Sequence, residues 1–300
     1  MPSGRILISG ASGLVGSLLA EHLKVLGYRV TALTRSRRPD SILWDPENRS
    51  IEREKLSGFD ALINLAGENI AARRWNPRFK KEIYASRAQS TEFLIESLAE
   101  SGRFPRVFIS ASAVGYYGDA GEEEVTEDRP AGGGFLSEVC RAWEAAAQGA
   151  RAFGARVICM RLGVVLNVSG GALARMLPVF RLGLGGRIGS GRQWMSWISS
   201  ADLCAAVEFI LKNDSLSGAV NLVSPEPVRN IDFARLLAAI LRRPAVFPLP
   251  AFAARLIFGQ LAQETILRST RALPARLSAE GYHFSAANLL VALKHELYPR

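Results

Sequence analysis

The chain has 300 residues, of which 48% are hydrophobic, so it is long enough to bury a large core in one or two domains. Its formal net charge of +9 comes from dispersed arginines rather than from one basic run. No nucleic-acid motif accompanies this charge, and no apolar stretch approaches the roughly 20 residues that span a bilayer. We therefore expect neither a nucleic-acid partner nor a membrane partner, and a phosphate-rich cofactor or substrate explains the charge at least as well.

Short apolar runs alternate with helical stretches over the first two-thirds of the chain. This alternation is typical of an α/β fold, here a Rossmann-type doubly wound parallel sheet with helices on both faces. Strands are predicted at 5–9, 29–33, 61–65, 106–110 and 156–162, and helices at 79–101, 203–211, 231–241, 251–258 and 285–297. Because the composition changes near residue 218, we assign 1–217 to the main domain and 218–300 to a smaller C-terminal α-rich lobe on the substrate side.

A glycine-rich turn, Gly10-Ala11-Ser12-Gly13-Leu14-Val15-Gly16, follows the first predicted strand and opens an amphipathic helix. Gly10 allows a tight turn, Gly13 lets the backbone approach a pyrophosphate, and Gly16 permits close packing of the helix on the strand. The free N–H groups of the helix N-terminus favour a phosphate. The sequence therefore predicts a dinucleotide site, with a plain glycine turn as the alternative.

The end of the second strand separates NADP from NAD. A site for NAD places Asp or Glu there to bind the ribose 2′-hydroxyl, whereas this chain has Thr34-Arg35-Ser36. A guanidinium pairs with a 2′-phosphate through parallel hydrogen bonds. We predict NADP(H), with Arg35 on the phosphate and Thr34 or Ser36 as a hydroxyl partner; a solvated basic loop is the alternative.

The glycine spacing, together with Asn64-Leu65-Ala66-Gly67 after a later strand, resembles the extended short-chain dehydrogenase/reductase superfamily. Further segments, Arg73-Arg74-Trp75, Ser86-Arg87, Trp197-Ile198 and Pro274 among them, look like its sugar-nucleotide epimerase-like branch, in which a C-terminal domain of unknown function follows the NAD(P)-binding domain. The resemblance covers essentially the whole chain. It implies cofactor contacts at Gly10, Ser12, Gly13, Leu14, Val15, Gly16, Thr34, Arg35, Leu65, Ala66, Glu82, Arg87 and Val165.

Enzymes of this superfamily use a Ser or Thr with a Tyr-x-x-x-Lys pair for proton transfer. Ser112, at a strand end, supplies a hydroxyl in the expected place, and Ser110 is the reserve. Leu136 and Cys140 stand where the Tyr and Lys are expected, and neither serves as that pair because leucine holds no proton and an ordinary thiol is largely neutral at pH 7. Alternative proton carriers are Tyr116, Tyr117, Glu138 and Glu68.

A loop with many glycines, residues 183–194, lies between the main domain and the lobe. Arg187, Arg192 and Gln193 are predicted to bind an anionic group such as a nucleotide diphosphate, with Trp194 or Trp197 stacking on a base or sugar. A flexible surface loop is an equal alternative. Arg161, at a strand end, is a further candidate substrate contact, and we expect Asp202 to cap the helix that follows it.

Cysteines and histidines are few and scattered, so we expect no metal site and a reduced, cytoplasmic protein. The expected oligomeric state is a monomer or a homodimer. Two functions remain open at this point. The first is an NADP(H)-dependent epimerase or oxidoreductase acting on a sugar-nucleotide-like or other small polar substrate. The second is a non-catalytic NADP(H)-binding regulatory or sensor protein.

Overall fold

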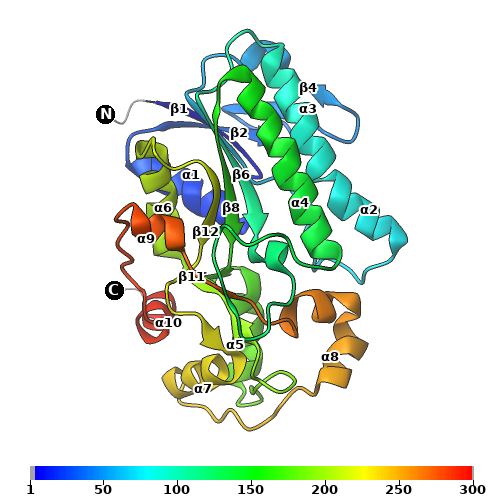
Figure 1. Ribbon diagram of the computed structural model, residues 1–300, viewed down its shortest axis with the longest axis vertical. Coiled ribbons are helices and arrows are strands. Elements are labelled where there is room, and N and C mark those ends of the chain that lie inside the picture. Colours follow the sequence, from blue (N-terminus) through cyan, green and yellow to red (C-terminus); the bar gives the residue numbers. More distant parts are fainter. Residues whose placement is uncertain (1–3, 299–300) are drawn as a thin grey trace.

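The computed structural model describes residues 4–298 and shows a large sheet with its helices above a smaller lobe (Figure 1). The sheet has eight strands in the order β12-β8-β6-β5-β1-β2-β3-β4, and every neighbouring pair is parallel except β3 with β4. The predicted Rossmann-type α/β fold is confirmed. The strands are β1 (Arg5–Ser9), β2 (Arg29–Thr34), β3 (Ser41–Asp45), β4 (Ser50–Ile51), β5 (Ala61–Asn64), β6 (Val107–Ala113), β8 (Arg156–Leu162) and β12 (Gly218–Leu222).

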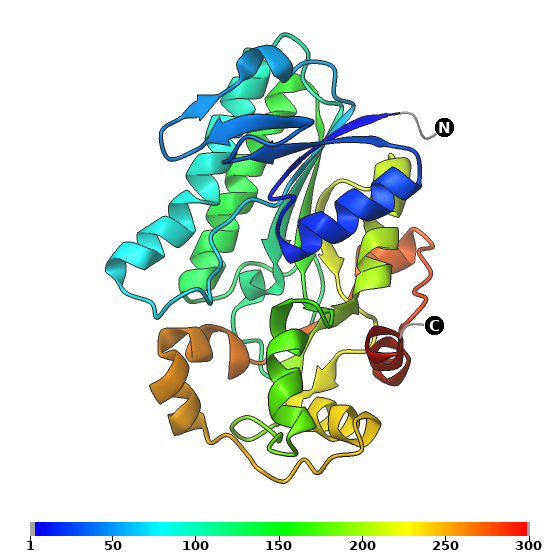
Figure 2. The same ribbon diagram turned by 180° about the vertical axis from the view of Figure 1, so that it is seen from behind.

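Helices cover both faces of this sheet, as Figures 1 and 2 show from opposite sides. The helices α1 (Leu14–Val25) and α6 (Ser200–Lys212) lie on one face, and α3 (Ala88–Ala99) and α4 (Phe135–Gln148) on the other. Since successive strand side chains point to opposite faces, Ile6 and Ile8 pack toward α1 while Leu7 packs toward α3. Burial on both faces explains why the strands are almost continuously apolar.

The helix expected at 79–101 is two helices, α2 (Pro77–Ala85) and α3, so the prediction of one continuous helix is wrong. The break lies at Arg87, which has φ −112° and ψ −69°. Its guanidinium donates to the carbonyl oxygens of Ile83 at 3.1 Å and Glu68 at 2.9 Å. These bonds tie the break to the loop after β5, and helical periodicity alone does not reveal such a contact.

The lower lobe is made from two separate parts of the chain. The helix α5 (Gly171–Arg181) packs with α7 (Asn230–Ile240) and α10 (Leu289–Leu297), while α8 (Ala251–Phe258) lies beside them (Figure 1). By contrast β12 is an edge strand of the main sheet, so residues 218–222 belong to that sheet. The division expected at residue 218 therefore falls in front of a sheet strand rather than at the start of the lobe.

Ser199, and not Asp202, caps α6, because its hydroxyl accepts a hydrogen bond from the Asp202 N–H at 3.0 Å. The buried Asp202 carboxylate instead accepts from the backbone N–H groups of Ser285 at 2.7 Å and Ala286 at 3.0 Å. The expected N-cap role is thus wrong: Asp202 fastens the segment before α10 to the main domain. No helix within residues 4–298 is long and apolar enough to cross a membrane.

Candidate functional site

The strand order reverses beside β1, with β2 on one side and β5 on the other. In open α/β sheets the ligand crevice lies at such a point, outside the carboxyl ends of the strands. Gly10 leaves β1 there with φ +70°, and a Cβ at this position would lie 2.8 Å from the carbonyl of Leu65. The glycine turn and the loop after β5 therefore meet at the crevice.

The glycines of the turn differ in what the fold itself requires of them. A Cβ on Gly16 would lie 2.2 Å from the Gly10 carbonyl oxygen, so close packing of α1 on the turn demands glycine. A Cβ on Gly13 would meet only that same oxygen, at 3.4 Å, and Gly13 has φ −76°. Packing within the chain therefore does not explain why position 13 is a glycine, whereas the close approach of a phosphate to the backbone would explain it.

The N-terminus of α1 suits an anion. Its N-cap, Gly13, makes no side-chain capping bond, and no acidic residue lies in the first turn of the helix. The unpaired N–H groups of the first turn and the helix dipole both favour negative charge. Ser12 and Gly13 are exposed at this end of the sheet, so the residues present fit a pyrophosphate.

A buried chain of polar groups supports the crevice from below. The Ser9 hydroxyl donates to the Asn64 side chain at 2.6 Å, and the Asn64 amide donates to Thr91 at 2.8 Å. Ser9 also accepts from the N–H groups of Leu65 at 3.1 Å and Ala66 at 3.2 Å. These bonds hold the predicted cofactor contacts Leu65 and Ala66 in place. Sequence reasoning missed the role of Ser9, although a polar residue ending an apolar strand is a usable signal.

Three apolar positions predicted to contact the cofactor line the start of α1. Leu14 lies against the backbone of Gly170: a Cβ added to Gly170 would be 3.1 Å from the Cδ1 atom of Leu14. Val15 and Val165 both pack on the core beneath α1, and Val165 lies in β9 (Val164–Leu166). The structure thus brings these residues together near the glycine turn.

The residues expected at an adenosine phosphate lie at the end of β2, the strand next to β1. Thr34 donates its hydroxyl hydrogen to the Ser36 carbonyl at 2.6 Å and so shapes the turn. Arg35 is exposed, and no carboxylate of residues 4–298 lies within salt-bridge distance of its guanidinium. Its hydrogen-bond donors are therefore available to a ligand.

Glu82 and Arg87 are both engaged within the protein. Glu82 forms ion pairs with Arg73 and, at 3.3 Å, with Arg78. Arg87 is held by the carbonyl groups described above, and burial lowers the pKa of its guanidinium. The structure thus brings Arg87 to the loop after β5, but the Glu82 carboxylate is paired on α2.

Ser112 belongs to a buried ionic network. Its hydroxyl donates to Glu144 at 2.6 Å, and Glu144 accepts two bonds from the Arg161 guanidinium, both at 2.9 Å. Arg161 also donates to the Tyr117 hydroxyl at 3.0 Å, and that hydroxyl donates to Asn221 at 2.7 Å. Burial raises the pKa of Tyr117 to about 12. Arg161 and Tyr117 are therefore tied to protein partners rather than free for a substrate.

Glu144 and Asn221 were missed from the sequence. Asn221 lies in β12, and only the pairing of β12 with β8 brings it to Arg161. Glu144 did carry a signal, because it follows Cys140 by four residues on α4 and so lies on the same face of the helix. A carboxylate on the inward face of an amphipathic helix indicates a buried partner.

The other candidate proton carriers have different surroundings. Tyr116 is half-buried, and the Arg161 guanidinium lies 3.5 Å above the centre of its ring. Glu138 is exposed on the first turn of α4. Leu136 and Cys140 are buried on the same helix, and burial together with the Glu144 charge raises the pKa of the Cys140 thiol to about 11. Cys140 is consequently a neutral thiol beside Ser112.

The loop at 183–194 is held by many internal bonds. Arg187 donates to the Gly189 carbonyl, and the Gln193 amide donates to the carbonyls of Ile188 at 3.0 Å and Ile266 at 3.1 Å. Trp194 donates its indole N–H to Glu122 at 3.0 Å and has two arginine side chains over its ring. Arg192 alone of the predicted substrate contacts has an exposed side chain.

The lobe reaches the main domain at the start of α4. Glu264, a buried carboxylate of the lobe, accepts from the N–H groups of Phe135 at 3.4 Å and Leu136 at 3.3 Å. Arg268 lies 3.2 Å from the same carboxylate. Leu136, at the position expected for the catalytic tyrosine, is thus next to a carboxylate that was not predicted from the sequence.

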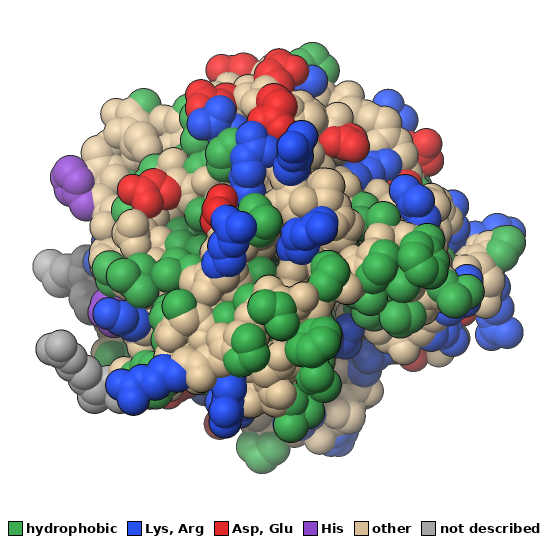
Figure 3. Space-filling view, turned by 90° about the horizontal axis from the view of Figure 1, so that it is seen from below, with side chains coloured by type: hydrophobic (Ala, Val, Ile, Leu, Met, Phe, Trp, Pro, Cys, Tyr) green, Lys and Arg blue, Asp and Glu red, His purple; other side chains and the backbone are tan. Residues whose placement is uncertain are grey.

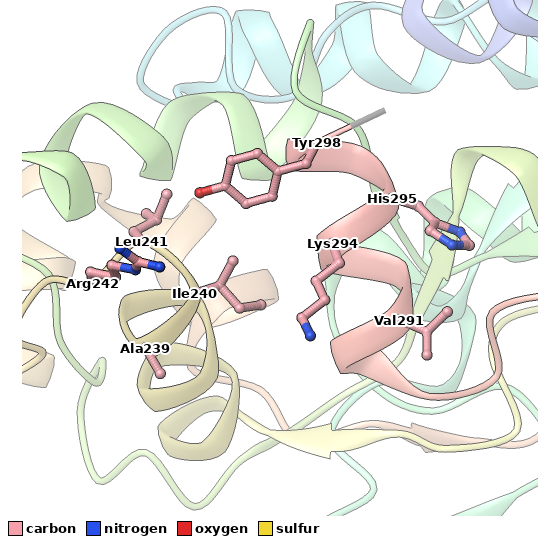
Figure 4. Close-up of a pocket in the computed structure, with 8 residues that line it drawn as sticks. All are labelled: Ala239, Ile240, Leu241, Arg242, Val291, Lys294, His295 and Tyr298. Atoms are coloured by element: carbon pink, nitrogen blue, oxygen red, sulfur yellow. The ribbon is translucent and has the colours of Figure 1, made fainter. Parts of the chain in front are cut away.

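A cavity with a different location lies between α7 and α10 of the lobe (Figure 4). Its volume is about 790 Å³, and it is lined by Ala239, Ile240, Leu241, Arg242, Val291, Lys294, His295 and Tyr298. It shares no residue with the glycine turn. Among residues 4–298, no three His, Cys, Asp or Glu side chains are grouped to hold a metal, and the three cysteines are free and buried.

The fold and the crevice are those of a Rossmann-type α/β protein whose glycine-rich turn at residues 10–16 suits a dinucleotide. Residues 6–222 match the NAD dependent epimerase/dehydratase family, and residues 249–296 match a domain of unknown function, DUF1731. The chain belongs to the NAD dependent epimerase/dehydratase family. The resemblance read from its motifs, including the C-terminal domain of unknown function, is confirmed.

Relatives match over nearly the full chain. An epimerase family protein of Mycobacterium bovis is 42% identical over 286 residues, which are 95% of this chain and 94% of that protein. The crystal structure of human epimerase family protein SDR39U1 with NADPH has a TM-score of 0.91 at 36% identity and covers 99% of this chain and 100% of that one. A nucleoside-diphosphate sugar epimerase from Corynebacterium glutamicum has a TM-score of 0.80 at 37% identity, covering 98% of this chain and 58% of the other.

Proposed function

We propose that this chain binds NADP(H) at the turn from Gly10 to Gly16 and acts as an oxidoreductase or epimerase on a small polar substrate, such as a sugar nucleotide. Gly13 carries the proposal, because packing within the chain does not require a glycine there. The NADPH in the human relative and the sugar nucleotide named for the Corynebacterium relative support it. When bound, the nicotinamide supplies hydride transfer.

In this proposal the chain holds the cofactor at three places. The N–H groups at the start of α1 receive the pyrophosphate, and Leu65 and Ala66 run along the cofactor on the loop that Ser9 fixes. Arg35 pairs with the 2′-phosphate, since its guanidinium is exposed and meets no carboxylate within residues 4–298.

We further propose Tyr116 as the group that moves a proton at the substrate. Ser112 gives its hydrogen to Glu144, and the Tyr117 hydroxyl lies between Arg161 and Asn221. Tyr116 lies in the short helix at 114–117 that comes directly after β6, and its hydroxyl has no hydrogen-bond partner among residues 4–298. Its ring is held by Arg161, so the phenol is oriented while its hydroxyl stays available. Glu138 is the reserve because it is exposed.

On the substrate side, we propose that Arg192 meets the anionic part of the substrate. It is the exposed arginine of the 183–194 loop, while Arg187, Gln193 and Trp194 hold that loop in shape. A phosphate is the chemistry that suits such an exposed guanidinium.

Binding and turnover test the proposal separately. NADPH binding is followed by nicotinamide fluorescence, and turnover by absorbance with a panel of carbonyl compounds and nucleotide sugars. We expect Arg35→Asp to weaken NADPH far more than NADH, while Arg103→Asp, which makes the same charge change on an exposed loop before β6, alters neither. Equal weakening of both cofactors would remove the case for the 2′-phosphate, and no NADPH binding would overturn the whole proposal.

A second candidate is a non-catalytic NADP(H)-binding protein whose bound cofactor sets a conformation that a partner reads. The neutral, buried Cys140 and the engaged Ser112 hydroxyl favour it. Tight NADPH binding with no turnover over the whole panel is its expected result, and turnover of any substrate in that panel excludes it.

A further inference from the structure

The underside of the lobe exposes large apolar side chains on two stretches of chain. On α8, Phe252 is 72% exposed and Leu256 is 71% exposed. After α5, Leu182 is 74% exposed, and Phe247 in the loop before α8 is 55% exposed. Apolar side chains exposed singly are common, whereas a contiguous patch of them marks an interaction site.

These stretches lie side by side. The Phe247 N–H donates to the Gly185 carbonyl at 3.3 Å, and the Leu249 N–H donates to the Arg187 carbonyl at 2.9 Å. A Cβ on Gly189 would lie 3.6 Å from the Cβ of Ala251, at the start of α8. Figure 3, which views the molecule from below, shows hydrophobic side chains gathered on this face with basic side chains between them. We call this surface, made of residues 179–189 and 242–258, the lower face.

The lower face carries positive charge without any negative charge in its own segments. Residues 168–201 and 233–263 contain eight arginines and neither Asp nor Glu. Arg181, Arg243 and Arg255 are exposed on it. The cavity between α7 and α10 is also positively charged, because Arg242 and Lys294 line it. Lys294 extends from α10 toward α7 (Figure 4).

We propose that the lower face docks on the surface of an anionic phospholipid bilayer. Exposed Phe and Leu side chains enter the boundary of headgroups and acyl chains, and arginines beside them meet lipid phosphates. A second copy of this chain is a poor occupant, because two such faces repel each other. The expectation of no membrane partner rested on the lack of a spanning segment, which says nothing about a face assembled from separate stretches.

Co-sedimentation with vesicles tests this proposal without relying on the proposed function. The full chain is mixed with vesicles of phosphatidylcholine alone or of phosphatidylcholine with phosphatidylglycerol. We expect binding only to the second kind, weakened by added salt because the Debye length shortens. The double variant Phe252→Ser, Leu256→Ser should lower the partition coefficient at least about tenfold. Arg255→Glu should lower it about fivefold or more.

Two matched controls keep the result specific. Val25→Ser removes an 83% exposed apolar side chain at the end of α1, and Arg103→Glu reverses an exposed charge in the main domain. Both should bind vesicles like the parent chain, and an unchanged Tm shows that each variant is folded. Equal binding to uncharged vesicles, no binding to either kind, or equal loss in the controls would each overturn the proposal. The proposal would also be overturned if the chain bound no vesicles and instead formed a concentration-dependent dimer, or bound an acidic protein, through a contact that Phe252→Ser abolishes.

Discussion

Two glycines of one turn should respond in opposite ways to the addition of a single methyl group. In Gly16→Ala the new Cβ would lie 2.2 Å from the Gly10 oxygen and 2.7 Å from the Ala11 Cα, and both are backbone atoms. Overpacking of this kind costs about 1–3 kcal/mol, which lowers the Tm by roughly 2–10 °C. In Gly13→Ala the nearest atom is 3.4 Å away and φ is −76°, so the Tm should stay unchanged or rise slightly.

Cofactor binding should separate the two variants further. Gly13→Ala places its methyl group where the backbone is proposed to meet the pyrophosphate, and we expect NADPH affinity to fall at least about tenfold, or about 1.4 kcal/mol. Thermal unfolding gives the Tm, and fluorescence titration gives the affinity. A Gly13→Ala protein that binds NADPH like the parent would refute the assignment of this turn to the pyrophosphate. A Gly13→Ala protein that unfolds early would show that the packing argument is wrong.

Three further predictions concern the network at β6 and α4. Arg161→Met should lower the free energy of unfolding by about 3–5 kcal/mol, because it leaves the Glu144 carboxylate buried and unpaired, and a urea titration that shows less than about 1 kcal/mol counts against the network. Burial raises the pKa of the Cys140 thiol from its ordinary 9.0 to about 11, so the neutral thiol's contribution to the free energy of unfolding is present below pH 9 and is lost as the pH rises toward 11. Between pH 9 and 11 the free energy of unfolding of Cys140→Ala should therefore fall less than that of the parent, and an equal fall contradicts the argument. With any substrate that turns over, Tyr116→Phe should keep NADPH affinity and reduce turnover about a hundredfold or more, whereas unchanged turnover rejects Tyr116 as the proton carrier.

The fold class and the glycine-rich turn could be predicted from the sequence alone. Alternating apolar strands and amphipathic helices led to the Rossmann-type sheet, which is confirmed. The turn was readable because its requirements are local: a positive φ at Gly10 and close packing at Gly16 depend on residues near them in the chain. Local sequence patterns were therefore enough to predict the strands and the glycine-rich turn.

Which side chains are free and which are engaged depends on the packing between elements that are distant in the chain. Arg161 looked like a substrate contact, yet Glu144 from α4 and Tyr117 from the loop after β6 enclose it. The break at Arg87 depends on a carbonyl 19 residues earlier in the chain. The lower face is likewise assembled from two stretches that are 50 or more residues apart in sequence. Periodicity reports which way a residue faces on its own element, whereas the partner it meets depends on the packing of elements that are distant in the chain.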